Sequence, residues 1–405
     1  MSNHILLVAD GRSPTALSWI ANLQALGYDV SLVSTFPCKL PAGLRMFYIL
    51  PIALSRLSSG STSGGQHPPS SHMPSLIQKM VRRFAPTLQS LRYIIGPLTL
   101  FRFALTYRRL VKRINPDLVH ALRIPFEGML GSYTPAGFPF LASTWGNDLT
   151  LHADGSCLMR AFTKRCLQRV DGLTADTQRD IRLAREWGLP MTVPSLVVPG
   201  SGGLDLDAIT AAEGFDPSVY GIPTASDWVV NPRGLRPGSV HQDVFFAAIP
   251  AVLAERSNTC FICPSLAGNA QAQAWVEQFN LQQSTHLLPK LPQPLLWSLL
   301  KRSQVFVSPS SHDGTPNSLL EAMACGSFPV VGDIESMREW ITPGVNGLLV
   351  DPLNPQQLAT AICQALDDPN LRQTAADHNL ALVNQRAAQS ATQPKIDAFY
   401  RLFIS

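Results

Sequence analysis

The segment Val305-Phe-Val-Ser-Pro-Ser-Ser-His-Asp313-Gly-Thr-Pro-Asn-Ser-Leu-Leu-Glu321-Ala-Met-Ala-Cys-Gly326-Ser-Phe-Pro-Val-Val331 decides the fold prediction. It contains two apolar runs of the length expected for buried strands. Between them lie a polar loop and a short helical pattern that stops at Gly326. A strand, a helix and a second strand in this order predict a parallel pair joined by a right-handed crossover. The segment therefore indicates a doubly wound α/β domain.

The same segment predicts an anion site. Asp313 precedes the helical pattern, and Glu321 lies eight positions further along the chain. The backbone N–H groups of residues 317–319 would begin the helix, where unpaired donors and the helix dipole favour a phosphate. Helix capping is the alternative interpretation of the two carboxylates, but a position at the carboxyl end of a buried strand favours a ligand site. We interpret the segment as a site for a sugar diphosphate.

Length and composition bound the class of protein. A chain of 405 residues exceeds one ordinary core and predicts two domains. A hydrophobic content of 45% with 15% charged residues is typical of a folded chain rather than a disordered one. The N-terminus lacks the basic start and long apolar core of a signal peptide, and seven scattered cysteines indicate a reducing compartment. We therefore expect a cytoplasmic protein.

Strand-like runs alternate with helical patterns along the chain, which predicts parallel sheets in both domains. We expect an N-terminal acceptor-side domain over 1–222, a C-terminal nucleotide-sugar-binding domain over 223–380 and a closing helix over 381–405. Two such domains facing each other leave a cleft at the carboxyl ends of their strands, where ligands bind. The predicted strands are 5–9, 30–33, 47–50, 118–121, 140–143, 172–175, 196–198, 228–231, 260–263, 286–288, 305–307, 328–331 and 348–350.

Positive charge is concentrated in one part of the chain, although the net charge is only +4. Between Val30 and Pro116 there is no Asp or Glu, and basic residues alternate with large apolar ones. This composition favours contact of residues 76–113 with an anionic membrane surface. A helical hairpin packed on its own domain is the alternative, and nucleic acid is the weakest interpretation because no recognition motif is present. The Gly/Ser/Pro-rich segment 58–75 predicts a mobile loop.

A resemblance to a known family extends these interpretations. Residues 228–366 resemble the retaining glycosyltransferases of family 4, which have the GT-B fold of two Rossmann-like domains facing across a cleft. The family pattern is Glu-x7-Glu followed by Ala-Met-Ala-x-Gly-x-Pro-Val-Val. In this chain the pattern reads Asp313-x7-Glu321 and then Ala322-Met-Ala-Cys-Gly326-Ser-Phe-Pro-Val-Val331. Further landmarks are Glu335-Ser-Met-Arg-Glu339-Trp340, residues 343–352, Thr144-Trp-Gly-Asn-Asp148, Ala175-Asp-Thr177 and Gly202-Gly-Leu-Asp205.

The resemblance implies a role for each matching position. Glu321 would hydrogen-bond the nucleotide ribose, and the backbone of residues 314–319 would hold the diphosphate and sugar hydroxyls. Asp313 would contact the transferred sugar, but it stands where the family usually has Glu, so its carboxylate lies one methylene further back. The donor-binding candidates are Gly11, Arg233, Arg236, Gly314, Thr315, Pro316, Asn317, Ser318, Leu319 and Glu321.

Two arginines follow the predicted strand at 228–231. Guanidinium groups bind phosphate through paired donors and stabilise charge on a departing diphosphate. The resemblance places an arginine at Arg233 and a lysine near Val240 and His241, where this chain has no lysine. Either Arg236 substitutes for that lysine or the second cation is missing, and a solvated loop arginine is the alternative for both positions.

The first half of the chain supplies the other candidates. Asp148, with Trp145 and Asn147, follows a predicted strand and would orient a hydroxyl of the acceptor or donor; a turn-forming cap is the alternative. His120 ends a strand and is an acceptor-side candidate, with a core histidine as the alternative. Gly11 would allow close backbone approach to the donor. The catalytic candidates overall are Asp313, Glu321, Arg233 and Asp148.

Several patterns exclude cofactors. No Gly-x-Gly-x-x-Gly follows the first strand, so a nicotinamide or flavin site is not expected. Cys260 and Cys263 have a metal-like spacing, but they lie in a strand pattern, which favours buried cysteines. Asp205-Leu-Asp207 mimics a metal-binding Asp-x-Asp motif and matches a Gly-x-Asp landmark instead. We expect no metal and no cofactor, and we treat the nucleotide-sugar as a substrate.

These observations predict a metal-independent glycosyltransferase of hexosyltransferase type. It would move a sugar from a nucleoside-diphosphate sugar to a hydroxyl with retained configuration, in cell-envelope polysaccharide or glycolipid synthesis. The basic segment suggests a lipid-linked acceptor and a peripheral place on the inner face of the membrane, with no nucleic-acid partner. The alternatives are a nucleotide-sugar 2-epimerase-like isomerase on the same fold and a non-catalytic nucleotide-sugar-binding scaffold.

Overall fold

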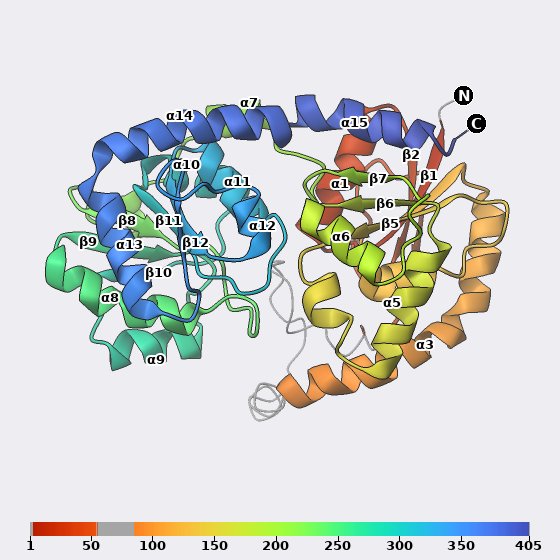
Figure 1. The fold of residues 1–405 in the computed structure, drawn as a ribbon, viewed down its shortest axis with the longest axis horizontal. Helices are drawn as coiled ribbons and strands as arrows, with labels where there is room; N and C mark the ends of the chain where they lie inside the picture. Colours follow the sequence, from red (N-terminus) through yellow and green to blue (C-terminus); the bar gives the residue numbers. More distant parts are fainter. Residues whose placement is uncertain (1–2, 54, 56–84, 405) are drawn as a thin grey trace. The chain divides into compact units, whose positions relative to one another are not determined.

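The computed structural model describes residues 3–53, 55 and 85–404, the first seven of the last range in backbone only. The predicted mobile loop at 58–75 and residues 76–84 of the basic segment lie outside the described residues. The chain forms two compact units, Met1–Gly202 with Thr392–Ser405 and Gly203–Ala391. Each unit contains one parallel sheet with helices on both faces (Figure 1). The predicted pair of doubly wound α/β domains is therefore confirmed.

Unit 1 is built on a seven-stranded sheet in the order β3-β2-β1-β4-β5-β6-β7. The order reverses direction at β1, because β1 pairs with both β2 and β4. Every predicted strand of this half is present, with ends that differ by at most one residue. The strands are β1 (His4–Ala9), β2 (Asp29–Ser34), β3 (Met46–Ile49), β4 (Leu118–Ala121), β5 (Phe140–Thr144), β6 (Gly172–Ala175) and β7 (Ser195–Val197).

Alternate side chains of the central strands enter two separate cores. In β1, Leu6 and Val8 pack among α3, α4 and α5, whereas Ile5 and Leu7 pack among α1 and α15. Both faces are apolar because a parallel sheet is covered on both sides. The helices of unit 1 are α1 (Pro14–Ala25), α3 (Ala85–Ile114), α4 (Met129–Gly131), α5 (Cys157–Arg169), α6 (Gln178–Glu186) and α15 (Gln389–Arg401), with π-helical turns at Ile124–Gly128 and Asp148–His152.

Unit 2 repeats this plan with a six-stranded sheet in the order β10-β9-β8-β11-β12-β13. Here the order reverses at β8, which pairs with both β9 and β11. The predicted strands are again present within one residue. They are β8 (Asp227–Val230), β9 (Thr259–Cys263), β10 (Thr285–Leu287), β11 (Val305–Ser308), β12 (Phe328–Gly332) and β13 (Leu348–Val350).

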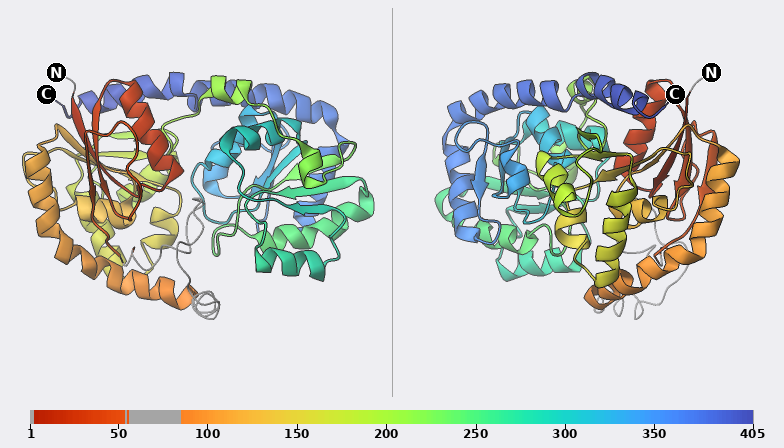
Figure 2. Two further views of the ribbon diagram at one scale, coloured as in Figure 1. Left: turned by 180° about the vertical axis from the view of Figure 1, so that it is seen from behind. Right: turned by 45° about the vertical axis from the view of Figure 1, so that its right-hand side comes forward.

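The helices of unit 2 also form two layers, visible from behind in Figure 2. One core packs α8, α9 and α13 against the sheet, and the other packs α10, α11 and α14 on the opposite face. The helices are α7 (Leu206–Ala211), α8 (Gln242–Glu255), α9 (Ala270–Gln278), α10 (Gln293–Arg302), α11 (Asn317–Ala324), α12 (Glu335–Arg338), α13 (Pro355–Asp367) and α14 (Pro369–Arg386), with a 3-10 turn at Pro217–Tyr220.

The described part of the basic segment forms one helix, α3, of 30 residues that contains Pro97, so a hairpin turn, the alternative for this segment, is absent from residues 85–113. A proline removes its own N–H and leaves the carbonyl four residues earlier without its helical partner. That carbonyl belongs to Tyr93, and Ser156 Oγ donates a hydrogen bond to it at 2.7 Å. A residue of another helix thus stabilises the continuous helix, which bends along its length in Figure 1. Within the described residues no helix is long and apolar enough to cross a membrane.

The units divide differently from the predicted domains. Residues 203–222 belong to unit 2, where Leu204 N donates to Ala387 O at 2.7 Å and Phe215 packs edge-on to Trp228. The predicted single closing helix over 381–405 is two helices, α14 and α15, divided between the units. The division follows from burial: Tyr400 of α15 is fully buried in the core of unit 1.

Candidate active site

Three predicted residues meet at the switch point of the unit 2 sheet, where the strand order reverses. Arg233 follows β8, and Asp313 follows the neighbouring β11. Arg233 Nη2 forms a hydrogen-bonded ion pair with Asp313 Oδ2, and Nη1 donates to Ser318 Oγ at 3.0 Å. Only 6% of the Arg233 side chain is exposed. In open α/β sheets, ligands bind at the carboxyl ends of strands at such a switch point.

A buried amide pair shapes the loop that carries Arg233. Asn231 Nδ2 donates to Gln242 Oε1 at 2.9 Å, and Gln242 Nε2 donates back to Asn231 Oδ1 at 3.2 Å. The same Asn231 oxygen accepts the Arg233 backbone N–H at 3.2 Å. Sequence analysis missed Gln242, whose only signal is its place at the start of the helix that follows this loop.

The loop that carries Asp313 is tied down from a third segment. Trp340 Nε1 donates to Thr315 Oγ1 at 2.8 Å, and Ser336 Oγ donates to the Asp313 carbonyl at 2.8 Å. Trp340 and Ser336 lie in the landmark after β12, which the sequence resemblance identified without a role. Their contacts give that landmark a structural role, because they fix the backbone of the predicted diphosphate loop.

Helix α11 begins directly after this loop. Its N-cap position is Pro316, which provides no side-chain hydrogen bond to the first turn. The amides at Asn317 and Ser318 therefore open the helix without a capping side chain, while Gly314, Thr315, Pro316 and Leu319 are buried around them. A helix start of this kind, beside a guanidinium, is suited to an anion.

Glu321 lies one turn further along α11 and is almost fully buried. Gln293, at the start of α10, donates a hydrogen bond to its Oε1. Burial raises the pKa of Glu321 to about 7, although the side chains of Trp297 and Gln293 partly offset the shift. Sequence analysis missed both α10 residues, because the segment after β10 carries no local motif. The group titrates near neutrality, which is unusual for a carboxylate.

Arg236 does not join Arg233. Its side chain is exposed, and its carbonyl accepts the backbone N–H groups of Ser239 and Val240 at 3.1 and 3.0 Å in a tight turn. At the expected lysine position the ring of His241 is hydrogen-bonded to Ser311 Oγ at 2.8 Å. Near this position the chain therefore provides a hydrogen-bonded histidine and serine where the family pattern has a lysine.

In unit 1, Asp148 is completely buried and fully engaged. It accepts two hydrogen bonds from Arg123, at 2.8 and 3.2 Å, and the backbone N–H groups of Ile124 and Trp145 at 3.0 and 3.2 Å. Burial raises the pKa of Asp148, and Arg123 opposes that shift. The structure thus supports the cap interpretation: Asp148 positions Arg123, which is one-third exposed and which sequence analysis missed.

The other candidates of unit 1, Trp145, Asn147 and Gly11, make contacts within the unit itself. Trp145 is half-buried and lies against Gly200, where an added methyl group would come within 3.2 Å of its ring. Asn147 immediately precedes the π-helical turn at Asp148–His152. Gly11 is buried, and an added methyl group there would lie 2.6 Å from Cys38 Sγ. The close approach that requires glycine at position 11 is therefore made by this unit's own cysteine.

His120, an acceptor-side candidate, is a core residue. It has no exposed surface, and its Nδ1 and Nε2 atoms are hydrogen-bonded to Tyr400 Oη at 2.5 Å and Ser143 Oγ at 2.9 Å. Burial lowers the pKa of His120 to about 3, so the ring is neutral. This corrects the acceptor-side assignment, because both nitrogens are used inside unit 1.

The cysteine pair in β9 cannot bind one ion together. Cys260 belongs to the core that contains α10 and α11, and Cys263 to the core that contains α8 and α13. The two thiols thus point to opposite faces of the sheet. Among the described residues no group of three His, Cys, Asp or Glu side chains has metal-binding geometry. Asp205, from the Asp-x-Asp pattern, caps α7 by accepting the Ala208 N–H at 2.9 Å.

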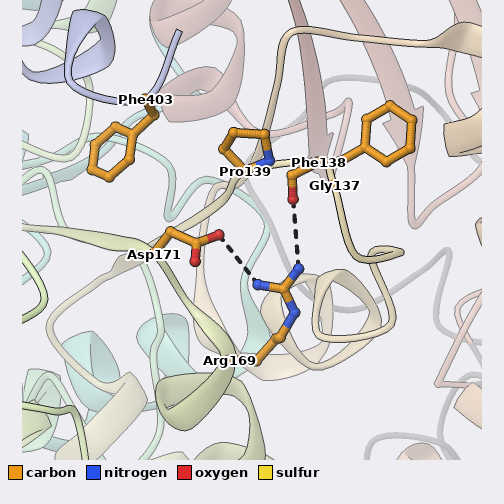
Figure 3. Close-up of a pocket in the computed structure, with 6 residues that line it drawn as sticks. All are labelled: Gly137, Phe138, Pro139, Arg169, Asp171 and Phe403. Atoms are coloured by element: carbon orange, nitrogen blue, oxygen red, sulfur yellow. Dashed lines mark hydrogen bonds and ion pairs between the residues drawn. The ribbon is translucent and has the colours of Figure 1, made fainter. Parts of the chain in front are cut away.

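An open pocket of about 370 Å³ lies elsewhere in unit 1 (Figure 3). Its lining includes Pro139 and Asp171, which directly precede β5 and β6, and the pair Arg169–Asp171 spans 3.2 Å. The pocket is therefore at the amino ends of the strands, opposite to the end where ligands bind in such sheets. Its position gives no support to a catalytic role.

Comparison with solved structures defines the class. The structure matches sucrose-phosphate synthase from Thermosynechococcus elongatus with a TM-score of 0.73 and 16% identity, over 99% of this chain and 98% of that one. It matches HepE from Anabaena, solved in complex with UDP-glucose, with a TM-score of 0.69 and 15% identity, over 98% and 99% of the chains. The fold is that of the GT-B glycosyltransferases.

Sequence comparison gives the family. The family described as glycosyl transferases group 1 matches residues 240–379, and the glycosyl transferase 4-like domain matches residues 10–200. The chain belongs to the group 1 glycosyltransferases, as the sequence resemblance predicted.

Curated relatives match over shorter stretches. A D-inositol 3-phosphate glycosyltransferase from Thermobispora bispora is 28% identical over 138 residues, 32% of each chain. An N,N'-diacetylbacillosaminyl-diphospho-undecaprenol alpha-1,3-N-acetylgalactosaminyltransferase from Campylobacter jejuni is 40% identical over 95 residues, 24% of this chain and 23% of that one. The matched stretches thus span about a third and about a quarter of the length of these relatives.

Proposed function

We propose that the protein transfers a sugar from a nucleoside-diphosphate sugar to a hydroxyl acceptor and that unit 2 binds the donor. One observation carries the proposal: buried Arg233 lies at the start of α11 between Asp313 and Ser318, and buried Glu321 lies one turn further on. The solved complexes of HepE with UDP and with UDP-glucose, which share this fold, support a nucleotide-sugar donor.

The donor would use each of these groups. The opening amides of α11 and the Arg233 guanidinium would bind the diphosphate, since both favour phosphate oxygens. Glu321 would accept hydrogen bonds from the ribose hydroxyls. With a guanidinium and helix amides at the diphosphate, no divalent ion would be needed to stabilise the departing group.

The reaction we propose retains the configuration of the sugar. The bond between the sugar's anomeric carbon and the diphosphate oxygen breaks, and the acceptor oxygen bonds to the same face of that carbon. The acceptor proton passes to a phosphate oxygen of the departing nucleoside diphosphate, so atoms and charge balance. The protein then contributes positioning and electrostatic stabilisation rather than a covalent intermediate.

Asp313 would change partners when the donor binds. In the structure it forms an ion pair with Arg233. A diphosphate that takes over the guanidinium would release Asp313 to contact the transferred sugar, where positive charge develops in the transition state. The shorter aspartate side chain fits this exchange, because it already reaches Arg233 and stays close to the loop backbone.

Helix α3 supports a second part of the proposal, a place at an anionic membrane surface and a lipid-linked acceptor of the cell envelope. Ile94, Leu98, Phe101 and Leu105 are each about half or more exposed, and their spacing places them on one face of the helix. Exposed Arg102, Arg108, Arg109 and Lys112 lie on the same helix. An apolar stripe with basic neighbours is typical of helices that lie in the membrane interface.

Two substitutions test the donor site. Arg233→Met and Glu321→Gln should each lower turnover about 100-fold or more, because each removes a group that binds the donor during transfer. The donor should also stop raising the melting temperature of both variants. Arg338→Met removes an exposed arginine paired with Asp333 and is the matched control. Folded variants with unchanged turnover and donor binding would contradict the proposal.

A further inference from the structure

Three arginines converge at the switch point of the unit 1 sheet. Arg12 follows β1, Arg123 follows the adjacent β4, and Arg92 reaches the same place from α3. The Cζ atoms of Arg12 and Arg92 lie 3.9 and 5.6 Å from the centre of the Phe36 ring, which follows β2. Arg92 also interacts through charge with Glu127, Arg123 and Asp10. We call Arg12, Arg92 and Arg123 the arginine cluster.

Arg12 and Arg123 are each hydrogen-bonded to a carboxylate through Nε and Nη2, which leaves the Nη1 donors for a ligand. Arg12 uses Nε and Nη2 to bind Asp10, both at 3.0 Å. Arg123 uses Nε and Nη2 to bind Asp148 at 3.2 and 2.8 Å. Within the described part of the chain, Nη1 of neither arginine has a hydrogen-bond partner. Both guanidinium groups are thus oriented, with donors still available.

Arg92 differs because no carboxylate of the described residues forms a hydrogen bond with it. It is largely buried against the Phe36 and Phe126 rings, with its Cζ atom 5.0 Å from the Phe126 centre, and its buried Nε has no hydrogen-bond partner among the described residues. Burial lowers the pKa of Arg92, the charge of Glu127 opposes that shift, and the like charge of Arg123 adds to it. A buried guanidinium without a partner is costly to keep, since it stays charged at neutral pH.

A third carboxyl, that of Glu127, interacts with the arginine cluster through its charge and is hydrogen-bonded elsewhere. Glu127 is buried and accepts a hydrogen bond from Thr35 Oγ1 at 2.6 Å rather than one from an arginine. Burial raises the pKa of Glu127, and the charge of Arg123 opposes that shift. Asp10 and Asp148 bind Arg12 and Arg123, so Glu127 is the one further carboxyl whose charge interacts with Arg92 among the described residues.

We propose that the arginine cluster binds a phosphate group of the acceptor substrate, and that the acceptor of this transferase is therefore a phosphorylated compound. The role of the bound compound as an acceptor rests on the proposed function, whereas the phosphate site itself does not depend on it. Donors from three guanidinium groups suit a tetrahedral group with several oxygens better than a planar carboxylate, which one fork already satisfies. The site also lies where open α/β sheets bind ligands.

Calorimetric titration with inorganic phosphate tests the site without any turnover. The full-length protein carries Arg233→Met, so that phosphate binding at the donor loop is removed from the measurement. Adding Arg92→Met keeps the apolar stem against both rings and should weaken phosphate binding by about tenfold or more. Adding Arg92→Lys, which keeps the charge but loses the fork, should give an intermediate loss.

The control is Arg160→Met on the same background, because Arg160 is an exposed arginine of unit 1 paired with Asp154. It should leave phosphate affinity unchanged. Circular dichroism confirms that each variant is folded, and Arg92→Lys decides the matter if Arg92→Met unfolds. The proposal is overturned if Arg92→Met or Arg92→Lys leaves the phosphate affinity unchanged. It is also overturned if the Arg233→Met protein does not bind phosphate.

Transfer assays then distinguish the source of the phosphate. One arm offers soluble sugar phosphates and the other a polyprenyl-diphosphate-linked sugar in detergent, each beside its phosphate-free counterpart. The protein should prefer the phosphorylated compound in one arm, and Arg92→Met should raise KM for it by about tenfold while kcat changes little. Equal use of phosphorylated and phosphate-free acceptors overturns the inference. Arg92-dependent phosphate binding without transfer to any acceptor would instead count against the proposed function alone.

Discussion

Burial decides the charge state of Glu321, the carboxylate on which donor recognition depends in our proposal. Its pKa near 7 means that the side chain carries a proton below neutrality and is ionised above it. The other titratable group that interacts with it is Cys325, whose pKa burial raises to about 12, so the thiol remains neutral. Over the physiological range the local charge therefore depends on Glu321.

The affinity for the donor should increase with pH between about 6 and 8, because ionised Glu321 accepts hydrogen bonds from both ribose hydroxyls. A nucleotide-sugar is the suitable ligand for this titration, since its diphosphate does not titrate near neutrality. Calorimetry across this range should give a rising affinity for the native protein and a flat profile for Glu321→Gln. A rising profile that persists in Glu321→Gln would assign the dependence to another group.

The stability of the unliganded protein should change in the opposite direction. A carboxyl with a raised pKa holds its proton more tightly in the folded state, so its contribution falls as pH rises from about 4.5 through about 7. Glu321→Gln should therefore lose less stability than the native protein as the pH rises. Melting temperatures measured in the same buffers would show this difference.

At the scale of elements, β12 and the Asp313 loop approach closely at Gly332. A methyl group on Gly332 would lie 2.2 Å from the Ser310 carbonyl oxygen. Gly332→Ala should therefore cost about 2 kcal/mol of stability and displace the loop that carries Asp313. Gly234→Ala is the matched control, because its added methyl group would meet nothing nearer than 3.8 Å. Thermal denaturation with donor titration measures both effects, and equal behaviour of the two variants would contradict the expectation.

Helix α3 allows a test of membrane contact. The double variant Phe101→Asp/Leu105→Asp should sediment with vesicles of anionic phosphatidylglycerol at least about tenfold less than the native protein. Both positions are exposed, so folding should be unaffected. Leu380→Asp, on an exposed position of α14, is the control. Native protein that stays in the supernatant at low salt would end the membrane hypothesis.

The positions of the strands were largely predictable from the sequence, whereas contacts between segments far apart in the chain were not. Strands such as β4 and β6 are short apolar runs between turn residues, so their ends follow from local signals. The sequence left the course of the chain at Pro97 open, because the support for a continuous α3 comes from Ser156, the N-cap residue of α5. A contact between residues 63 positions apart in the chain leaves no local mark in the pattern around the proline.

The site was predictable where one motif contains it. Asp313 and Glu321 stand in the quoted segment, and Arg233 follows a predicted strand, so the sequence alone makes all three candidates. Gln293 was missed because it reaches Glu321 from the segment after another strand. For His120 the sequence left an acceptor-side residue and a core histidine open, because it does not reveal that Tyr400 of the last helix uses its ring nitrogen.

At the scale of the whole molecule, the last helix completes the core of the first unit. Tyr400 Oη is hydrogen-bonded to Trp19 Nε1 at 3.0 Å and to His120 Nδ1 at 2.5 Å. Tyr400→Phe should lower the stability of unit 1 by about 2 kcal/mol, because two buried nitrogens lose their partner. Tyr28→Phe, whose hydroxyl bonds the partly exposed Asp397, should cost less since water can replace it. Thermal denaturation compares them, and equal losses would contradict this account.

This closing helix also constrains the order of folding during synthesis. A ribosome makes residues 203–391 before it makes residues 392–405, so the second unit is complete in the nascent chain while the first still lacks its final helix. Domains usually fold in the order of their synthesis. Here we expect Trp19 and His120 to remain uncovered until translation has passed Tyr400, which makes the earlier half of the polypeptide the later one to mature and a natural client for chaperones.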